Sequence, residues 1–271
     1  MTDKSEIRNP KSEIPLSAIA LIPARYASTR LPGKPLLDRT GKPMIQHVVE
    51  RVREAKHVSR VAVATDDQRI YDAVLAFGGE AVMTRADHPN GTSRLAEAAD
   101  ALLGPTPEGA RHTPDAPLIV NVQGDEPEIE ASVIDQLIQG LANDPDAPMA
   151  TLASPFAPDE DPANPNIVKV VVAATGRALY FSRALIPHDR DNTREHAPLK
   201  HPGLYVYRRW FLDQYVQLAP TPLEETEKLE QLRALEHGHA IAIVRTHVHH
   251  TGIDTPEQYD AFVGRVRQST M

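Results

Sequence analysis

Three cationic side chains follow the first apolar run of the chain, which is the segment Ala-Ile-Ala-Leu-Ile at residues 18–22. They are Arg25, Arg30 and Lys34, and they lie in one loop that contains Pro and Gly. A triphosphate suits such a loop, because arginine can hold phosphate oxygens through two parallel hydrogen bonds. The loop is not a Walker motif, since its Gly-Lys pair is followed by Pro instead of Ser or Thr. A solvated basic loop is the alternative interpretation.

Two aspartates could complete such a site. Asp125 follows the mostly apolar residues 117–122 after Gln123 and Gly124, and Asp254 comes just before the last helical segment. Mg²⁺ takes one or two carboxylates and completes its shell with phosphate oxygens and water. Each aspartate could instead cap a helix, but Thr255 already supplies a cap beside Asp254. The sequence therefore predicts a magnesium site on Asp125 and Asp254.

Composition excludes several classes of protein. A formal charge of −8 argues against a nucleic-acid-binding protein, which needs a basic face. The chain has no cysteine, so disulfides, thiol nucleophiles and thiolate zinc sites are all excluded. No apolar run approaches the roughly 18 residues that span a bilayer. We expect a cytoplasmic protein that binds neither nucleic acid nor membrane.

The pattern of apolar segments predicts the fold class. Strands are expected at residues 18–22, 60–65, 81–84 and 117–122, and helices at 43–52, 68–77, 92–103 and 131–142. Alternation of strand and helix at this spacing is typical of a doubly wound, mostly parallel α/β sheet. We expect a flexible N-terminal extension at residues 1–16 and one domain at 17–271, with an exposed connection at 104–117.

The second half of the chain has a different rhythm. A hairpin is expected from residues 167–173 and 178–182, followed by a short strand at 204–207. A helix is expected at 223–236, a strand at 240–244 and a last helix that opens with a capping box at 255–258. This small antiparallel section is expected to form a lid or a dimer surface.

Five segments together resemble the 3-deoxy-manno-octulosonate (Kdo) cytidylyltransferases, or CMP-Kdo synthetases. They are the opening loop and residues 120–127, 180–183, 229–233 and 251–256. The resemblance runs from about residue 17 to residue 267. It implies the fold of nucleotide-diphospho-sugar transferases, a homodimer, and a role in lipopolysaccharide biosynthesis.

The resemblance also implies a reaction, in which the anomeric hydroxyl of Kdo attacks the α-phosphorus of CTP and pyrophosphate leaves. Arg25, Arg30 and Lys34 would hold the β- and γ-phosphates, and Mg²⁺ on Asp125 and Asp254 would join the α-phosphate to the sugar. Positioning and charge neutralisation would then carry catalysis. The residue chemistry identifies no general base.

The remaining site residues also come from the resemblance. Those expected to bind the sugar acid are Gln123, Arg183, His201, Tyr205, Glu230 and Gln231. Cytosine would be read near Ala64, Asp66 and Arg85. Two alternatives stay open: CMP transfer to another sugar acid, such as an 8-amino analogue or a sialate, and a nucleotide-sensing module without turnover.

Overall fold

The computed structural model describes residues 16–27, 30–106, 116–191, 193, 196–248 and 252–269. The predicted extension at residues 1–16 lies outside these ranges except for Leu16, and so does most of the predicted connection at 104–117. None of the described helices is long and apolar enough to cross a membrane.

A ten-stranded sheet forms the centre of the described chain, in the order β3-β2-β1-β4-β9-β5-β8-β6-β7, with β10 paired to β5. Strands β1, β2, β3 and β4 are parallel, whereas β9 runs antiparallel between β4 and β5. The predicted hairpin is confirmed as the antiparallel pair β6–β7. The bounds are β1 Ala18–Ala24, β2 Val58–Thr65, β3 Glu80–Met83, β4 Leu118–Asn121, β5 Met149–Pro155, β6 Lys169–Val172, β7 Ala178–Ser182, β8 Leu199–Lys200, β9 Tyr205–Arg208 and β10 Ile241–Arg245.

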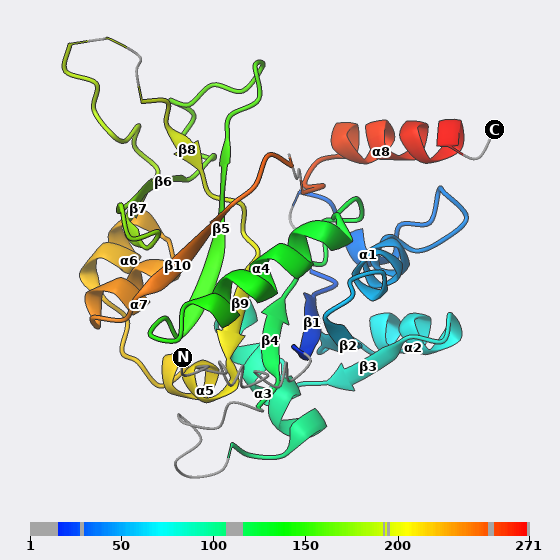
Figure 1. Cartoon of the computed structure of the whole chain (residues 1–271). Helices are drawn as coiled ribbons and strands as arrows, with labels where there is room; N and C mark the ends of the chain where they lie inside the picture. Colours follow the sequence, from blue (N-terminus) through cyan, green and yellow to red (C-terminus); the bar gives the residue numbers. More distant parts are fainter. Residues whose placement is uncertain are drawn as a thin grey trace, which may run out of the picture.

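Helices cover both faces of this sheet. One apolar core lies between the sheet and α1 (Met44–Arg53), α2 (Gln68–Ala76) and α4 (Ala131–Asn143). A second core lies on the other face, under α3 (Gly91–Leu103), α5 (Arg209–Tyr215) and α7 (Gln231–Glu236). Figure 1 shows α4 crossing in front of the strands, with the β6–β7 hairpin far from α1 and α2. The predicted doubly wound, mostly parallel sheet with a small antiparallel section is confirmed.

The C-terminal helix α8 (Pro256–Ser269) makes a third, smaller cluster. Its Tyr259, Phe262 and Val263 pack against Met44 at the start of α1 and Leu31 in the opening loop. Figure 1 shows α8, in red, beside α1. This packing brings the end of the chain to the cationic loop near its beginning.

Several details differ from the sequence-based expectations. The first strand continues to Ala24 instead of ending at residue 22. Its pairing with β4 stops at Leu21, so Pro23, which has no N–H, lies where only β2 continues beside it. Strand β5 was missed because its sequence, Met-Ala-Thr-Leu-Ala-Ser-Pro, has few β-branched residues. The short helix α5 was also missed.

The predicted helix at residues 223–236 is two helices, α6 (Pro222–Glu227) and α7. The break is at Lys228, which takes a left-handed backbone conformation with φ 53°. Leu229, Leu232 and Leu235 have helical spacing, but all three follow Lys228, so their spacing indicates the second helix and contains no signal for the break.

Candidate active site

Lys34 lies between the two predicted metal-binding carboxylates. Its Nζ is 2.7 Å from Oδ2 of Asp125 and 3.0 Å from Oδ1 of Asp254. The other oxygen of Asp254 is 3.0 Å from Nη2 of Arg30. Four of the residues proposed from the sequence therefore meet in one partly buried cluster of two cations and two carboxylates.

The opening loop reaches this cluster through a tight turn at Gly33. The backbone of Gly33 has φ 66°, a conformation that side chains disfavour, and the Tyr26 ring lies 3.2 Å from where a Cβ would be. The short 3₁₀ helix η1 (Lys34–Leu36) begins directly after this turn. Glycine at residue 33 thus allows Lys34 to point back toward the ends of the strands.

The segment after β4 lies against the first strand. A Cβ on Gly124 would be 2.9 Å from the carbonyl oxygen of Pro23, so only glycine fits here without a backbone shift. The carbonyl oxygen of Asp125 accepts a hydrogen bond of 2.9 Å from the N–H of Ile253. This backbone bond joins the loops that carry the two aspartates.

The predicted capping box at the start of α8 is confirmed. Thr255 Oγ1 accepts from the N–H of Gln258, and Gln258 Oε1 accepts from the N–H groups of Thr255 and Asp254. The carboxylate of Asp254 takes no part in the cap and bonds Lys34 and Arg30 instead. The side chain of Asp254 therefore does not cap α8.

The donor set at this cluster suits magnesium better than zinc. Among the described residues, no group of three or more His, Cys, Asp or Glu side chains could hold a metal ion. Two carboxylates that leave room for phosphate oxygens and water are the pattern of Mg²⁺ sites, which seldom use a cage made only of protein. Asp125 and Asp254 supply such a pair of carboxylates, and here the cations Lys34 and Arg30 pair with them.

Burial changes the charge beside this cluster. Glu126 is buried, and its burial together with the neighbouring Asp125 carboxylate raises the pKa of Glu126 to about 8. At neutral pH its carboxyl group is therefore mostly protonated, and Asp125 supplies the negative charge of this segment. No sequence pattern distinguished these two adjacent acids by burial.

The residues predicted to read cytosine lie at the ends of β2 and β3. Ala64 is fully buried in β2, and Asp66 follows the end of that strand. Arg85 follows β3 and is exposed, with its backbone N–H 3.3 Å from the carboxylate oxygens of Glu97. Asp66 pairs with the buried Arg94 of α3 at 3.0 Å. Arg94 was not proposed from the sequence, although a lone arginine on the apolar face of a helix is a signal that could have found it.

Four of the predicted sugar-binding residues gather near the start of β9. Gln123 Nε2 donates to the carbonyl of Gly203 at 3.3 Å, and the rings of His201 and Tyr205 are 5.4 Å apart. The carboxylate of Glu230 accepts from Thr92 Oγ1 at 3.0 Å, and burial raises its pKa. Arg25 is exposed, and its positive charge lowers the pKa of Glu230, against the larger effect of burial. Gln231 follows in the first turn of α7 and is buried.

His201 is held neutral by its surroundings. Burial lowers the pKa of His201 to about 3. Its Nε2 lies 2.9 Å from Thr151 Oγ1, whose hydroxyl is also 2.7 Å from the carbonyl of Leu204. If the single hydroxyl proton goes to that carbonyl, His201 must donate from Nε2.

Arg183 does not join the cluster at Lys34. Its guanidinium donates to backbone carbonyls of Glu227 at 2.7 Å and Pro165 at 3.0 Å, and lies 3.4 Å from the carbonyl of Lys228. These contacts hold the break between α6 and α7. Its binding of a sugar carboxylate stays a prediction.

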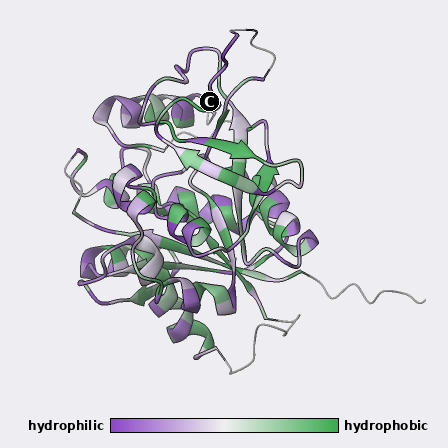
Figure 2. Cartoon of the chain, turned by 90° about the vertical axis from the view of Figure 1, so that its left-hand side faces the viewer, coloured by the Kyte–Doolittle hydropathy of each residue, from purple (hydrophilic) through white to green (hydrophobic). Residues whose placement is uncertain are grey.

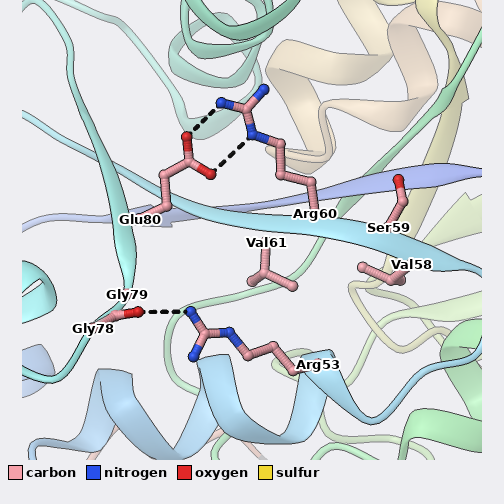
Figure 3. Close-up of a pocket in the computed structure, with 8 residues that line it drawn as sticks. All are labelled: Arg53, Val58, Ser59, Arg60, Val61, Gly78, Gly79 and Glu80. Atoms are coloured by element: carbon pink, nitrogen blue, oxygen red, sulfur yellow. Dashed lines mark hydrogen bonds and ion pairs between the residues drawn. The ribbon is translucent and has the colours of Figure 1, made fainter.

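A pocket on the described part of the chain lies away from these residues. It is formed where β2 and β3 begin, and Figure 3 shows its lining side chains. Arg60 forms an ion pair with Glu80, and Arg53 donates to the carbonyl of Gly78 at 3.1 Å (Figure 3). Ligands of parallel α/β sheets bind at the opposite, carboxyl ends of the strands, so we place the active site at the Lys34 cluster.

The chain is similar to known proteins over most of its length. Residues 19–241 match the family described as Cytidylyltransferase. The chain is 50% identical over 255 residues to the 3-deoxy-manno-octulosonate cytidylyltransferase of Syntrophobacter fumaroxidans, covering 93% of this chain and 98% of the relative. The protein of the same name from Syntrophotalea carbinolica is 49% identical over 250 residues, with 89% and 95% covered.

A solved structure is also similar over nearly the whole chain. It is that of a CMP:2-keto-3-deoxy-manno-octonic acid synthetase complexed with CTP, with 45% identity and a TM-score of 0.83. The alignment covers 93% of this chain and 99% of the other. With this sequence identity, this fold and this cluster of cations and carboxylates, the chain belongs to the 3-deoxy-manno-octulosonate cytidylyltransferase family.

Proposed function

We propose that this protein transfers CMP from CTP to the anomeric hydroxyl of Kdo and releases pyrophosphate, giving CMP-Kdo for lipopolysaccharide biosynthesis. The proposal rests on the similarity to the solved CMP:2-keto-3-deoxy-manno-octonic acid synthetase complexed with CTP. The chain is 45% identical to that protein, with a TM-score of 0.83. The sugar oxygen forms a bond to the α-phosphorus, and the bond from that phosphorus to the β-phosphate oxygen breaks. Electrostatic stabilisation of the departing pyrophosphate is then the main task of the protein.

The cations of the opening loop would perform this task. A lysine ammonium has three donors, and Lys34 directs two of them to Asp125 and Asp254. The third is left for a phosphate oxygen. The exposed guanidinium groups of Arg25 and Arg30 can each offer two parallel donors to the same triphosphate.

We further propose that Mg²⁺ binds at Asp125 and Asp254. When bound, it would polarise the α-phosphate and lower the pKa of the attacking hydroxyl. Asp125→Asn and Asp254→Asn keep the side-chain shape but remove charge, so both should lose Mg²⁺-dependent turnover and weaken Mn²⁺ binding measured by electron paramagnetic resonance. Asp260→Asn is the matched control, because Asp260 is exposed on α8 and pairs with Arg39. Wild-type turnover and Mn²⁺ binding in Asp254→Asn would remove this residue from the metal site.

A substrate panel tests the reaction itself. The purified protein is mixed with CTP, Mg²⁺ and one of Kdo, its 8-amino analogue, sialate or a neutral hexose, and pyrophosphate release is measured. We expect Kdo to react fastest. A preference for the 8-amino analogue would change the assigned sugar, and no release with any sugar would favour the nucleotide-sensing alternative.

We also propose a cytoplasmic homodimer. Large apolar side chains are exposed at Leu179 on β7, Leu185 after it and Leu223 on α6. Figure 2 faces this side of the molecule and shows strands coloured as apolar toward the viewer. Sedimentation velocity should give a dimer for the wild type and a monomer for Leu179→Glu, whereas Leu75→Glu on α2 should leave the dimer intact.

The proposed cytoplasmic location is consistent with the composition, because a cysteine-free chain needs no oxidising compartment. Cell fractionation tests this location.

A further inference from the structure

Arg94 is a buried charge at the base end of the predicted nucleotide site. Only 1% of its side chain is exposed, although it lies in the first turns of α3 among Leu95, Ala98 and Ala99. Its Nη2 is 3.0 Å from Oδ2 of Asp66, and its Nη1 donates to Thr84 Oγ1 at 2.5 Å. Its Nε has no hydrogen-bond partner among the described residues.

Stability alone does not explain this arginine. A buried ion pair loses the hydration of both charges, and well-packed apolar residues of similar volume are often as stable or more stable. Arg94 also leaves one buried N–H group unpaired among the described residues, which adds to the unfavourable side. A role in positioning a functional group gives a physical reason for a charge at this position.

The contacts of Arg94 join the ends of two strands. Asp66 follows β2 and Thr84 follows β3, and the N–H of Thr84 donates to the carbonyl of Thr65 at 2.8 Å. One helical turn further along α3, Glu97 accepts from the backbone N–H of Arg85. Helix α3 thereby fixes both segments that are predicted to read the base.

The pairing also orients the carboxylate of Asp66. Arg94 takes Oδ2, whereas Oδ1 accepts no hydrogen bond from another residue in the described part of the chain, and the side chain is 21% exposed. A free carboxylate oxygen accepts from the 4-amino group of cytosine but repels the carbonyl oxygen that uracil carries at the same position. An oxygen fixed in this way could distinguish CTP from UTP.

We propose that Arg94 is a positioning residue that orients Asp66 toward the amino group of cytosine, so that this ion pair sets the preference for CTP over UTP. The inference rests on the proposed function, because it takes CTP as the substrate. It names Asp66 as the acceptor and Arg94 as the group that holds it.

The first experiment compares Arg94→Met and Arg94→Lys with Arg209→Met. Arg209 is a matched control, because it is similarly buried, pairs with Asp100 of α3 and Asp213, and has an Nε that is also unpaired among the described residues. We measure kcat and KM for CTP and UTP, together with equilibrium binding of both nucleotides by calorimetry. In Arg94→Met, KM for CTP should rise and the CTP/UTP binding ratio should fall at least tenfold, with partial recovery in Arg94→Lys. Arg209→Met should lose stability and keep the ratio.

The second experiment keeps Arg94 and changes its partner. In Asp66→Asn, the guanidinium can pair only with the amide oxygen, so the NH₂ group faces the base and should favour UTP. Adding Arg94→Met to Asp66→Asn should abolish that preference, since nothing then fixes the amide. If Arg94→Met fails to fold, Asp66→Asn by itself still tests the proposal.

Three outcomes would overturn the proposal. They are an unchanged CTP/UTP ratio in a folded Arg94→Met, an equal change in Arg209→Met, or an Asp66→Asn variant that still prefers CTP as the wild type does. Failure of the proposed function is distinguishable, because it would appear as wild-type protein that binds CTP without transferring CMP to Kdo.

Discussion

At the scale of single residues, Lys34 is the side chain whose environment bears most directly on phosphate binding. It lies between Asp125 and Asp254, and only 14% of its side chain is exposed. Such a cation is held in place before the substrate arrives, so little side-chain entropy remains to be lost on binding. Neither aspartate caps a helix through its side chain, because Thr255 and Gln258 cap α8 and α4 begins only at Ala131.

We expect Lys34→Met to lower kcat/KM for CTP at least tenfold, because loss of a charged partner from a phosphate costs about 1.5–3 kcal/mol. Steady-state kinetics with varied CTP at saturating Kdo measure this effect. Lys42→Met is the control, because Lys42 is exposed and pairs with Glu50 on α1. Unchanged kinetics in Lys34→Met would remove Lys34 from the phosphate site.

Arg183 has a different environment and gives a separate prediction. We expect Arg183→Lys to raise KM for Kdo while KM for CTP stays nearly unchanged, because lysine cannot form the two parallel bonds that a guanidinium makes with a carboxylate. Its contacts to the carbonyls of Glu227 and Pro165 also predict a lower melting temperature. A lower melting temperature with an unchanged KM for Kdo would assign this arginine to the turn between α6 and α7 alone.

At the scale of elements, the site depends on loops that approach one another closely at the ends of β1 and β4. Gly124 is the closest such point, since a Cβ there would lie 2.9 Å from the Pro23 carbonyl oxygen. That distance is shorter than side-chain carbons tolerate, so the loop that carries Asp125 would have to shift.

We therefore expect Gly124→Ala to lower kcat by tenfold or more, because a misplacement of about 1 Å in a catalytic group costs up to about 100-fold. Gly264→Ala is the control, because Gly264 is exposed on α8, away from the loop that carries Asp125, and a Cβ added there would meet no described atom within 4 Å beyond its own helix and chain neighbours. Circular dichroism and kcat are compared for both proteins. Equal activity of the two variants would mean that the loop adapts without moving Asp125.

At the scale of the whole molecule, buried titratable groups link stability to pH. His201 has a pKa of about 3 in the folded protein, against 6.5 for a free histidine side chain. Between pH 6.5 and pH 3 the unfolded chain binds a proton that folded His201 does not. The free energy of unfolding therefore falls as pH falls through this window, by about 1.4 kcal/mol per pH unit for one such group.

We expect His201→Gln to lose less stability than the wild type between pH 6.5 and pH 4.5, because glutamine does not titrate. Urea unfolding at several pH values measures the difference between the two proteins. The comparison removes the contribution of Glu126, because both proteins contain it. The pKa of Glu126, about 8 in the folded protein, makes the free energy of unfolding rise as pH falls from 8 to 4.5, which is opposite to the effect of His201. Parallel curves for the two proteins would mean that His201 becomes protonated within the folded state.

The sequence alone determined the class of fold, the succession of the main strands and helices along the chain, and the identity of the cationic loop. These features depend on local patterns, such as the apolar run of β1, the glycines that end α2 and the capping box of α8. The sequence also determined the family, because residues with defined chemistry stand in five separate segments. Local patterns missed β5 and the break at Lys228, where no strong periodicity changes.

Tertiary structure decided which of these residues meet. Lys34 is 91 residues from Asp125 and 220 residues from Asp254, and only the sheet order and the packing of α8 on α1 bring them together. The partners of Arg183 and Arg94 were likewise undetermined, because a charged side chain in a sequence does not show whether it is solvated, buried or paired. Pairing over such separations depends on the packing of the whole core, and no local pattern in the sequence shows which distant residues will meet.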